Sequence, residues 1–178
     1  MIEVSLKTKI ISTLLVAFVI GGLLRVFVIE AFIVRGDSME PTIMSGEYVF
    51  VNKLAYLNKN PKREDIIVVI PRGIRVKLLK RVIGMPDEYF EINEGKVLVR
   101  ENRTSTSTAL TEVYLPSGMT TESAREIFTN IDPKEYFVMG DNRETSIDSR
   151  TLDFVDRWDI KGKVIGSFNF SSFSYKGF

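Results

Sequence analysis

The chain of 178 residues contains no cysteine and no histidine. Without cysteine there is no disulfide, no thiol nucleophile and no cysteine-based zinc site. Without histidine the usual zinc and iron ligand sets are missing too, so we expect neither a metal nor a cofactor. The charge is nearly balanced, with 24 basic and 23 acidic residues, and no basic tract indicates binding to nucleic acid. A serine hydrolase of this composition needs a base other than histidine, and a lysine held neutral is the main alternative.

One long apolar segment lies near the N-terminus. Residues 10–24 are apolar except for two hydroxyl residues and two glycines, and the apolar character resumes after Arg25. A cleaved secretory signal would end at a small-residue site, which is not evident here, and a buried core helix would need a wider polar face. A membrane anchor needs about 20 mostly apolar residues. We therefore expect a short N-terminus at 1–9, one transmembrane helix at 10–28, and a folded catalytic domain at 29–178.

Basic residues flank this segment on both sides. Lys7 and Lys9 precede it and favour a cytoplasmic N-terminus, although Arg25 and Arg35 on the other side weaken that preference. We expect a single-pass protein of the cell membrane, with the lipid bilayer as a partner and the folded domain on the extracytoplasmic face. The aromatic run Phe168–Phe178 is a hypothesis for a second contact with the membrane surface.

Beyond the anchor, short runs rich in β-branched and aromatic residues alternate with turn residues. This pattern predicts a mainly β domain, a folded antiparallel sheet or barrel. Residues 101–134 differ, because they begin with a polar stretch of low complexity. We interpret them as a surface excursion of the domain and expect one short helix near 120–130. The expected strands are 48–51, 65–70, 75–83, the hairpin pair 89–92 and 96–100, 135–139 and 163–170.

The stretch 36–42, GDSMEPT, places a serine in a turn. Gly36 permits unusual backbone angles and Pro41 restricts the chain that follows. A hydroxyl nucleophile such as that of Ser38 needs a well-defined backbone and a nearby base. The same composition is also typical of an ordinary surface turn, so the stretch alone does not decide between the two.

Lys80 lies in the predicted strand 75–83. Strand alternation places it on one face with Leu78 and Val82, where it is the polar exception in an apolar row. Burial there would lower its pKa from about 10.4 and leave an amine able to take a proton from Ser38. The alternative is a lysine whose ammonium group reaches solvent from the rim of the sheet.

The stretch 140–150, GDNRETSIDSR, is dense in charged and hydroxyl groups. Such a loop is either solvated or ordered by Asp–Arg pairs and hydroxyl hydrogen bonds. The Ser146 hydroxyl could hold a neutral lysine amine in place. Asp148 could brace the loop with either Arg143 or Arg150, and the sequence does not choose between these two pairs.

Taken together, four blocks resemble the bacterial type I signal peptidases, membrane-anchored serine proteases that remove signal peptides from exported proteins. The blocks follow the order of that family behind an anchor, and the resemblance extends to about Phe170. They are Ser38–Thr42, Arg63–Val68, Lys80–Pro86, and Gly140–Arg143 followed by Ser146, Asp148, Ser149 and Arg150.

The resemblance implies Ser38 as nucleophile, Lys80 as general base and Ser146 as the hydroxyl that orients the lysine. The backbone N–H of Ser38 would donate to the oxyanion. Gly36 stands where some relatives carry a serine, so that side-chain donor is missing. The second oxyanion donor is left to a backbone group, with Gly36 as the candidate, or to a water molecule. Structural support for the site is assigned to Asp141, Arg143, Asp148 and Arg150.

The resemblance also implies the substrate, a preprotein signal peptide cut after an Ala-x-Ala pattern. The peptide would lie extended along the strand edges 32–36 and 77–79, over shallow apolar pockets that admit small side chains. The expected substrate-binding residues are Phe32, Val34, Met39, Leu78 and Leu79. Glu64 and Asp87 stand where glycine is usual in the family, and we expect them to alter loop shape rather than chemistry.

Two other interpretations compete with this one. A self-cleaving Ser/Lys repressor of related β-fold would carry a DNA-binding helical domain, and none is visible in the sequence. An inactive or specialised anchored β-domain could bind extended peptides without cutting them. All candidate catalytic residues are present, which favours the enzyme. The sequence says nothing about the oligomeric state.

Overall fold

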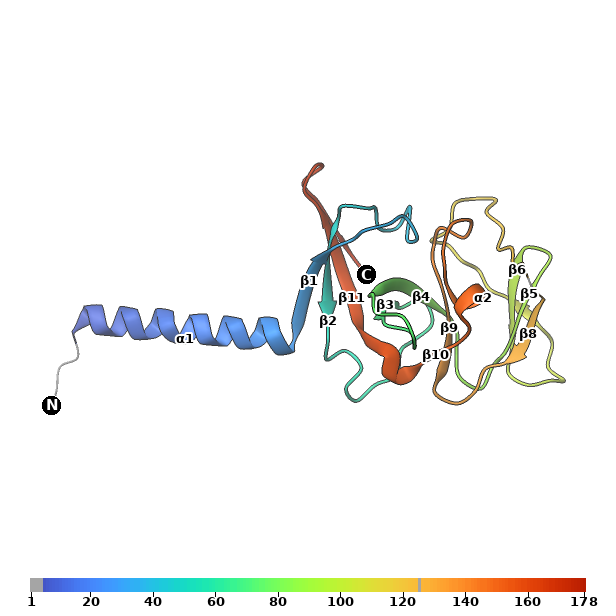
Figure 1. Ribbon diagram of the computed structural model, residues 1–178, viewed down its shortest axis with the longest axis horizontal. Helices are drawn as coiled ribbons and strands as arrows, with labels where there is room; N and C mark the ends of the chain where they lie inside the picture. Colours follow the sequence, from blue (N-terminus) through green and yellow to red (C-terminus); the bar gives the residue numbers. More distant parts are fainter. Residues whose placement is uncertain (1–4, 125) are drawn as a thin grey trace.

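The computed structural model describes residues 5–124 and 126–178, apart from the side chains of Leu24 and Val26. One long helix, α1 (Leu6–Phe27), extends away from a β domain (Figure 1). The expected N-terminal segment 1–9 falls partly outside the described residues, and α1 begins four residues before the expected start of the anchor.

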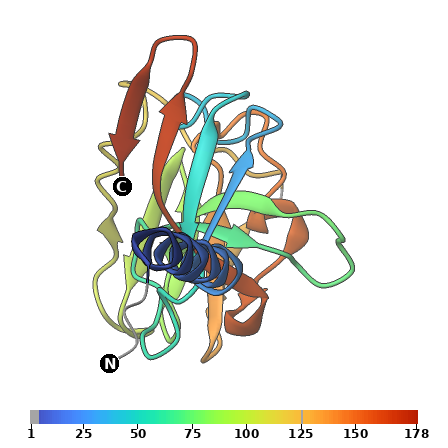
Figure 2. The same cartoon turned by 90° about the vertical axis from the view of Figure 1, so that its left-hand side faces the viewer.

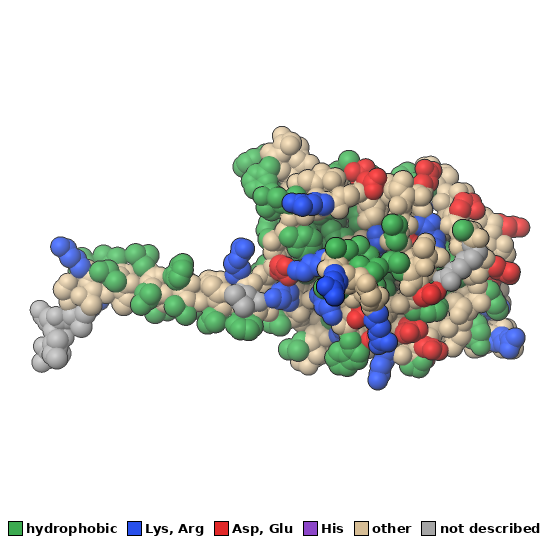
Figure 3. All heavy atoms as spheres, viewed as in Figure 1, with side chains coloured by type: hydrophobic (Ala, Val, Ile, Leu, Met, Phe, Trp, Pro, Cys, Tyr) green, Lys and Arg blue, Asp and Glu red, His purple; other side chains and the backbone are tan. Residues whose placement is uncertain are grey.

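α1 is apolar around most of its surface and stands clear of the domain. The apolar window Leu6–Leu23 is not buried anywhere, and Phe18 is 80% exposed. Figure 3 shows hydrophobic side chains along the helix and basic residues towards both of its ends. A helix of 22 residues is long enough to cross the hydrocarbon core of a bilayer. By length and composition, α1 is therefore a candidate membrane span.

The larger part of the domain is an eight-stranded antiparallel sheet, in agreement with the predicted mainly β fold. Its strand order is β1-β2-β11-β3-β4-β9-β10, and β12 also pairs with β11. The strands are β1 (Ile29–Ile33), β2 (Tyr48–Asn52), β3 (Ile66–Val69), β4 (Leu78–Gly84), β9 (Glu135–Met139), β10 (Val155–Asp156), β11 (Ile160–Asn169) and β12 (Ser174–Gly177).

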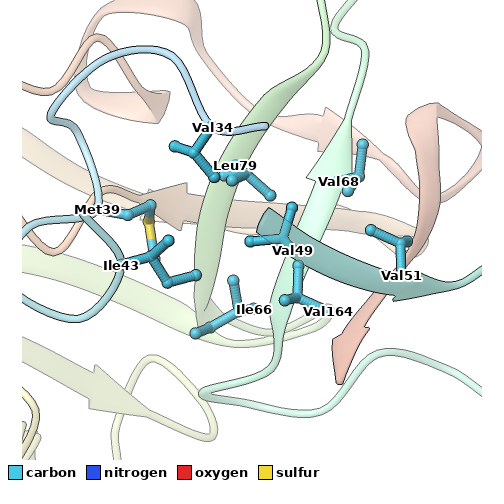
Figure 4. Packing of buried hydrophobic residues seen from close by; sticks show 9 residues of the cluster. All are labelled: Val34, Met39, Ile43, Val49, Val51, Ile66, Val68, Leu79 and Val164. Atoms are coloured by element: carbon cyan, nitrogen blue, oxygen red, sulfur yellow. The ribbon is translucent and has the colours of Figure 1, made fainter. Parts of the chain in front are cut away.

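The sheet curls so that its first and fifth strands in this order share one core. Nine buried side chains from the segments around β1, β2, β3, β4 and β11 pack together inside the curl (Figure 4). Met39 and Ile43 belong to this cluster although they lie outside the strands. The cluster comprises Val34, Met39, Ile43, Val49, Val51, Ile66, Val68, Leu79 and Val164.

A second sheet of four strands has the order β7-β6-β5-β8. β5 (Tyr89–Asn93) and β6 (Lys96–Arg100) form the predicted hairpin. The turn between them places Glu94 and Gly95 at φ 49° and 72°, the left-handed angles of a tight hairpin turn. Another cluster of buried side chains, which includes Phe90 and Phe137, joins this sheet to the larger one.

The short helix predicted near 120–130 is wrong. Residues 127–130 form β8 (Ile127–Asn130), which pairs with β5, and β7 (Thr108–Ala109) pairs with β6. The Ile127 side chain is buried beside Phe90 whereas the following Phe128 is exposed, which is the alternation of a strand. The interpretation of 101–134 as a surface excursion stays a prediction, but the segment supplies half of the strands of the small sheet.

The predicted strand 75–83 is shorter at its beginning than expected. β4 begins at Leu78, and Val76 lies in the preceding turn with its side chain exposed. Two other turns keep a backbone that favours glycine, because Glu64 and Asp87 have φ values of 71° and 65°. Both residues therefore adopt left-handed backbone angles although they carry side chains. That they alter loop shape rather than chemistry stays a prediction.

Candidate active site

Ser38 lies in the turn that connects β1 to β2. The adjacent Met39 is 1% exposed and packs into the core with Ile43, whose N–H donates to the Met39 carbonyl at 2.9 Å. Gly36, two residues before the serine, has a φ of 106°, which a residue with a side chain rarely adopts. Buried apolar side chains therefore hold the turn in place. Ser38 itself is half-buried.

Lys80 lies in the middle of β4, opposite Ile67 of β3, and is only 2% exposed. Its Nζ atom donates a hydrogen bond to the Ser146 hydroxyl at 3.0 Å. Burial lowers the pKa of Lys80 to about 8, while the nearby Asp148 carboxylate opposes the shift. The lysine is therefore not the solvent-seeking rim residue of the alternative interpretation, and a useful fraction of it is neutral near pH 8.

The lysine-binding hydroxyl is itself held by an ion pair. The Asp148 carboxylate accepts hydrogen bonds from Arg150 Nε and Nη2, each at 2.9 Å, and from the Gly140 N–H at 3.0 Å. Ser146 contributes a further hydrogen bond to the same carboxylate. Burial alone would raise the pKa of Asp148, but these bonds outweigh it and hold the pKa below its usual value.

This geometry selects Arg150, rather than Arg143, as the partner of Asp148. Asp148 also caps the short helix α2 (Ser149–Leu152), because its side chain accepts from the Arg150 N–H. One ordered chain of contacts thus runs from Lys80 through Ser146 to the Asp148–Arg150 pair.

Gly140 and Asn142 join the serine turn to the lysine network. Asn142 donates its N–H to the Ser38 carbonyl at 3.1 Å and its Nδ2 to the Asp37 carbonyl at 3.3 Å. A Cβ atom added at Gly140 would meet both the Ser38 carbonyl oxygen and the Ser146 side chain at less than 3.0 Å. The Ser38 backbone carbonyl and the Ser146 side chain therefore both pack closely against Gly140.

Two further ion pairs stiffen the loop 140–150, and the sequence did not reveal their partners. Arg81 makes a bidentate contact with Asp141, at 2.8 and 2.6 Å, and its guanidinium lies 3.9 Å from the centre of the Tyr114 ring. Arg143 is buried and pairs with Glu112. Asp141 and Arg143 thus occupy structural positions. Within residues 5–124 and 126–178, no three acidic side chains are placed to hold a metal ion.

A groove of about 430 Å³ opens beside Ser38, between the end of β1 and the start of β4. Four of the five expected substrate-binding residues line it, whereas Met39 is buried in the core beneath the turn. The lining residues are Phe32, Ile33, Val34, Arg35, Ser38, Val76, Lys77, Leu78 and Leu79.

Both sides of this groove carry strand edges that are open in the described part of the chain. β1 ends the strand order and pairs only with β2. β4 pairs with β9 from Arg81 onwards, so Leu78 and Leu79 have β3 on one side and the groove on the other. Such edges can pair with an extended peptide through backbone hydrogen bonds.

The two candidate oxyanion donors differ in availability. The Gly36 N–H donates to the Ser45 hydroxyl at 3.3 Å and is therefore engaged. The Ser38 N–H has no hydrogen-bond acceptor among the residues that the structure describes. An unpaired N–H beside the candidate nucleophile is suited to stabilise a developing negative charge.

Comparison with known proteins gives a consistent result. A family model described as "Signal peptidase, peptidase S26" matches residues 7–168, from α1 into β11. Signal peptidase I P of Bacillus subtilis subsp. natto is 34% identical over 85% of this chain and 83% of its own length. Signal peptidase IB of Staphylococcus aureus is 31% identical over 92% of this chain and 89% of its own. A solved signal peptidase I from Enterococcus faecalis V583 is 25% identical, with a TM-score of 0.47 over 59% of this chain and 97% of that one.

Proposed function

The chain belongs to the signal peptidase family, peptidase S26, and is a peptidase that removes signal peptides from preproteins; we propose that Ser38 is its nucleophile and Lys80 its general base. The observation that carries this proposal is a buried lysine amine, hydrogen-bonded to Ser146, at the loop that also contacts the Ser38 carbonyl. With a pKa of about 8, roughly a tenth of Lys80 is neutral at pH 7.

The proposed reaction uses the Lys80 amine twice. Its N–H bond to Ser146 fixes the nitrogen, so that the lone pair of the neutral form can accept the Ser38 hydroxyl proton. Ser38 Oγ then attacks the scissile carbonyl, and the Ser38 N–H stabilises the oxyanion. Lys80 passes its proton to the leaving amine, which yields the mature protein and an acyl-enzyme. Water, deprotonated by the same amine, releases the signal peptide.

For the substrate, we propose that the end of the signal peptide lies extended in the groove between β1 and β4. The open strand edges on both sides would bind its backbone, whatever its sequence. Val34 and Leu79 lie in the groove beside Ser38 and are largely buried, so the space above them suits small side chains. This arrangement supports the Ala-x-Ala preference.

We propose that α1 spans the membrane with Lys7 and Lys9 in the cytoplasm and the β domain on the extracytoplasmic side. The division into 1–9, 10–28 and 29–178 stays a prediction of that topology. Because the chain has no cysteine, single variants Ser5→Cys and Ser117→Cys, the latter at an exposed position of the small-sheet region, can report sidedness. An impermeant maleimide should label residue 117 in intact spheroplasts and residue 5 only after lysis. The reverse pattern would refute this orientation.

The hairpin of β11 and β12 supplies support for a second membrane contact. Phe173 at its tip is 80% exposed, and Phe170 and Tyr175 are exposed beside it. Figure 2, seen along α1 from the helix side, shows this hairpin on the face from which the helix emerges. We propose that these aromatic side chains rest in the membrane interface.

Cleavage of a preprotein by the full chain in liposomes tests the proposed function. The native chain should convert preprotein to mature protein, and Ser38→Ala and Lys80→Ala should each abolish conversion. Ser117→Ala and Lys96→Ala, at exposed positions of the small-sheet region, should behave as the native chain. Binding without cleavage by the native chain, where a control protease cuts, would support the peptide-binding adaptor instead.

A further inference from the structure

A second concave site lies away from the groove, where the loop after β2 meets the short helix η1 (Arg157–Asp159). Its volume is about 610 Å³, larger than that of the groove beside Ser38. Every charged residue that lines it is basic. We call it the basic pocket, and its cationic residues are Lys53, Lys59, Lys134, Arg157 and Lys161.

Arg157 holds together the two segments that form the basic pocket. Arg157 Nη2 donates to the carbonyl oxygens of Tyr56 and Lys59, the latter at 3.1 Å, and so ties the loop after β2 to η1. The Arg157 guanidinium also lies 5.5 Å from the centre of the Tyr56 ring. On the opposite side, Lys161 Nζ donates to the Trp158 carbonyl at 2.7 Å. Two of the five cationic side chains, those of Arg157 and Lys161, are therefore held in place by hydrogen bonds to backbone carbonyls.

Exposed apolar side chains accompany these charges. Leu57 and Trp158 line the basic pocket and are 72% and 74% exposed, and the neighbouring Leu54 is exposed as well. An exposed tryptophan beside lysines is the combination found at the boundary between lipid headgroups and hydrocarbon. Trp158 is also the one tryptophan of the whole sequence.

The basic pocket begins where the chain leaves the anchor. The Lys53 N–H donates to the carbonyl of Val28, the residue that follows α1, at 2.8 Å. Seen along α1, the loop after β2 and the aromatic β11–β12 hairpin lie on opposite sides of the helix (Figure 2). A domain held by α1 thus presents an aromatic edge on one side of its anchor and a basic edge on the other.

We propose that the basic pocket binds the phosphate groups of acidic phospholipids in the bilayer that α1 spans. Charge complementarity and the connection to the end of α1 favour a lipid over a free anion. Each lysine near an anionic surface contributes about 1 kcal/mol to binding, so several together dock the domain against the membrane. The second contact would also hold the groove at a fixed height above the bilayer. This proposal rests on the insertion of α1 but not on the roles of Ser38 and Lys80.

The single tryptophan allows a direct test with the full chain in liposomes. Vesicles would contain brominated phosphatidylcholine, alone or mixed with increasing phosphatidylglycerol, and the fluorescence of Trp158 would be recorded. We expect phosphatidylglycerol to shift the emission to the blue and to increase quenching by bromine. This titration gives an equilibrium constant for docking of the domain on the membrane surface. In the double variant Lys59→Gln/Lys161→Gln this constant should fall roughly 30-fold, about fivefold per lysine.

Controls separate the source of the anion and the state of the anchor. Lys96→Gln, exposed on β6 at the far end of the domain, should titrate as the native chain (Figure 1). Flotation of the vesicles reports the insertion of α1 independently of docking. An emission spectrum unaffected by phosphatidylglycerol, or a double variant that titrates as the native chain, would overturn the proposal. So would inorganic phosphate that gives the same shift in detergent, because the basic pocket would then be a site for free phosphate.

Discussion

In the proposed mechanism only the neutral form of Lys80 can deprotonate Ser38, so cleavage by this protein should depend steeply on pH. Burial lowers the pKa of this amine from 10.5 to about 8. Below that value each pH unit leaves about tenfold less neutral lysine, so kcat/KM at pH 6 should be ~100-fold below its plateau. The rising limb should have unit slope, since a single group titrates.

The same shift has a cost in folding free energy. Between the lowered pKa in the folded state and the ordinary pKa in the unfolded chain, the unfolded chain binds more protons, so stability increases with pH across that window. At 1.36 kcal/mol per pKa unit, the buried lysine costs about 3 kcal/mol at neutral pH. Lys80→Met has a similar volume and no charge. It should therefore abolish cleavage yet raise the free energy of unfolding by about 3 kcal/mol at pH 7, a gain that disappears as the pH approaches 10.5.

Two measurements on the detergent-solubilised full chain check this reasoning. Initial rates on a fluorogenic Ala-x-Ala peptide give the pH profile, and denaturant unfolding gives the stability of the native chain and of Lys80→Met. Lys96→Met, at an exposed site, serves as the matched control and should change neither quantity. A pH profile that is flat between 6 and 9, or a Lys80→Met variant that is markedly less stable than the native chain at pH 7, would refute a neutral buried base.

Other consequences concern the loop that carries the network. Gly140→Ala should lower kcat at least ~100-fold, because the added Cβ would displace the Ser38 carbonyl or the Ser146 hydroxyl. The control variant Gly22→Ala, which adds its Cβ in open space, should cleave the substrate at the native rate. Ser146→Ala should lower kcat roughly 100-fold with little change in KM and move the rising limb of the pH profile, whereas native kinetics would remove the orienting role. Glu112→Gln leaves Arg143 buried without its charge partner, and should lower the free energy of unfolding by ~3 kcal/mol in denaturant titrations; a loss under ~1 kcal/mol would show that the pair is dispensable.

Local patterns predicted the elements that depend on local chemistry. The apolar run predicted α1, and the alternation of apolar residues around Lys80 placed this lysine on the apolar face of a strand. The alternation left open whether its ammonium group is buried or reaches solvent. The pattern could not locate the start of β4. Val76 is a β-branched residue typical of strands, but no neighbouring strand pairs with it, and β4 begins only at Leu78. Nor could it detect β8, whose four residues become a strand only by pairing with β5.

Long-range pairing explains what the sequence did not reveal in the site. Arg81 alternates with apolar residues in β4, which signals burial, but its partner Asp141 lies 60 residues away and is brought close by the pairing of β4 with β9. Glu112 lies in a segment whose sequence shows no clear helix or strand pattern. It pairs with Arg143 only because the folded chain brings this segment next to the loop 140–150. This contact also resolves the ambiguity for Asp148: because Arg143 is engaged elsewhere, the carboxylate pairs with Arg150.

The central claim is that Ser38 forms an ester with the signal peptide after Lys80 has taken its proton. Rapid acid quenching of the full chain with an Ala-x-Ala substrate, followed by peptide mapping in a mass spectrometer, tests it most directly. We predict an acyl adduct on the peptide containing Ser38 in the native chain and none in Lys80→Met. An adduct on another residue, or the same adduct in Lys80→Met, would contradict the account.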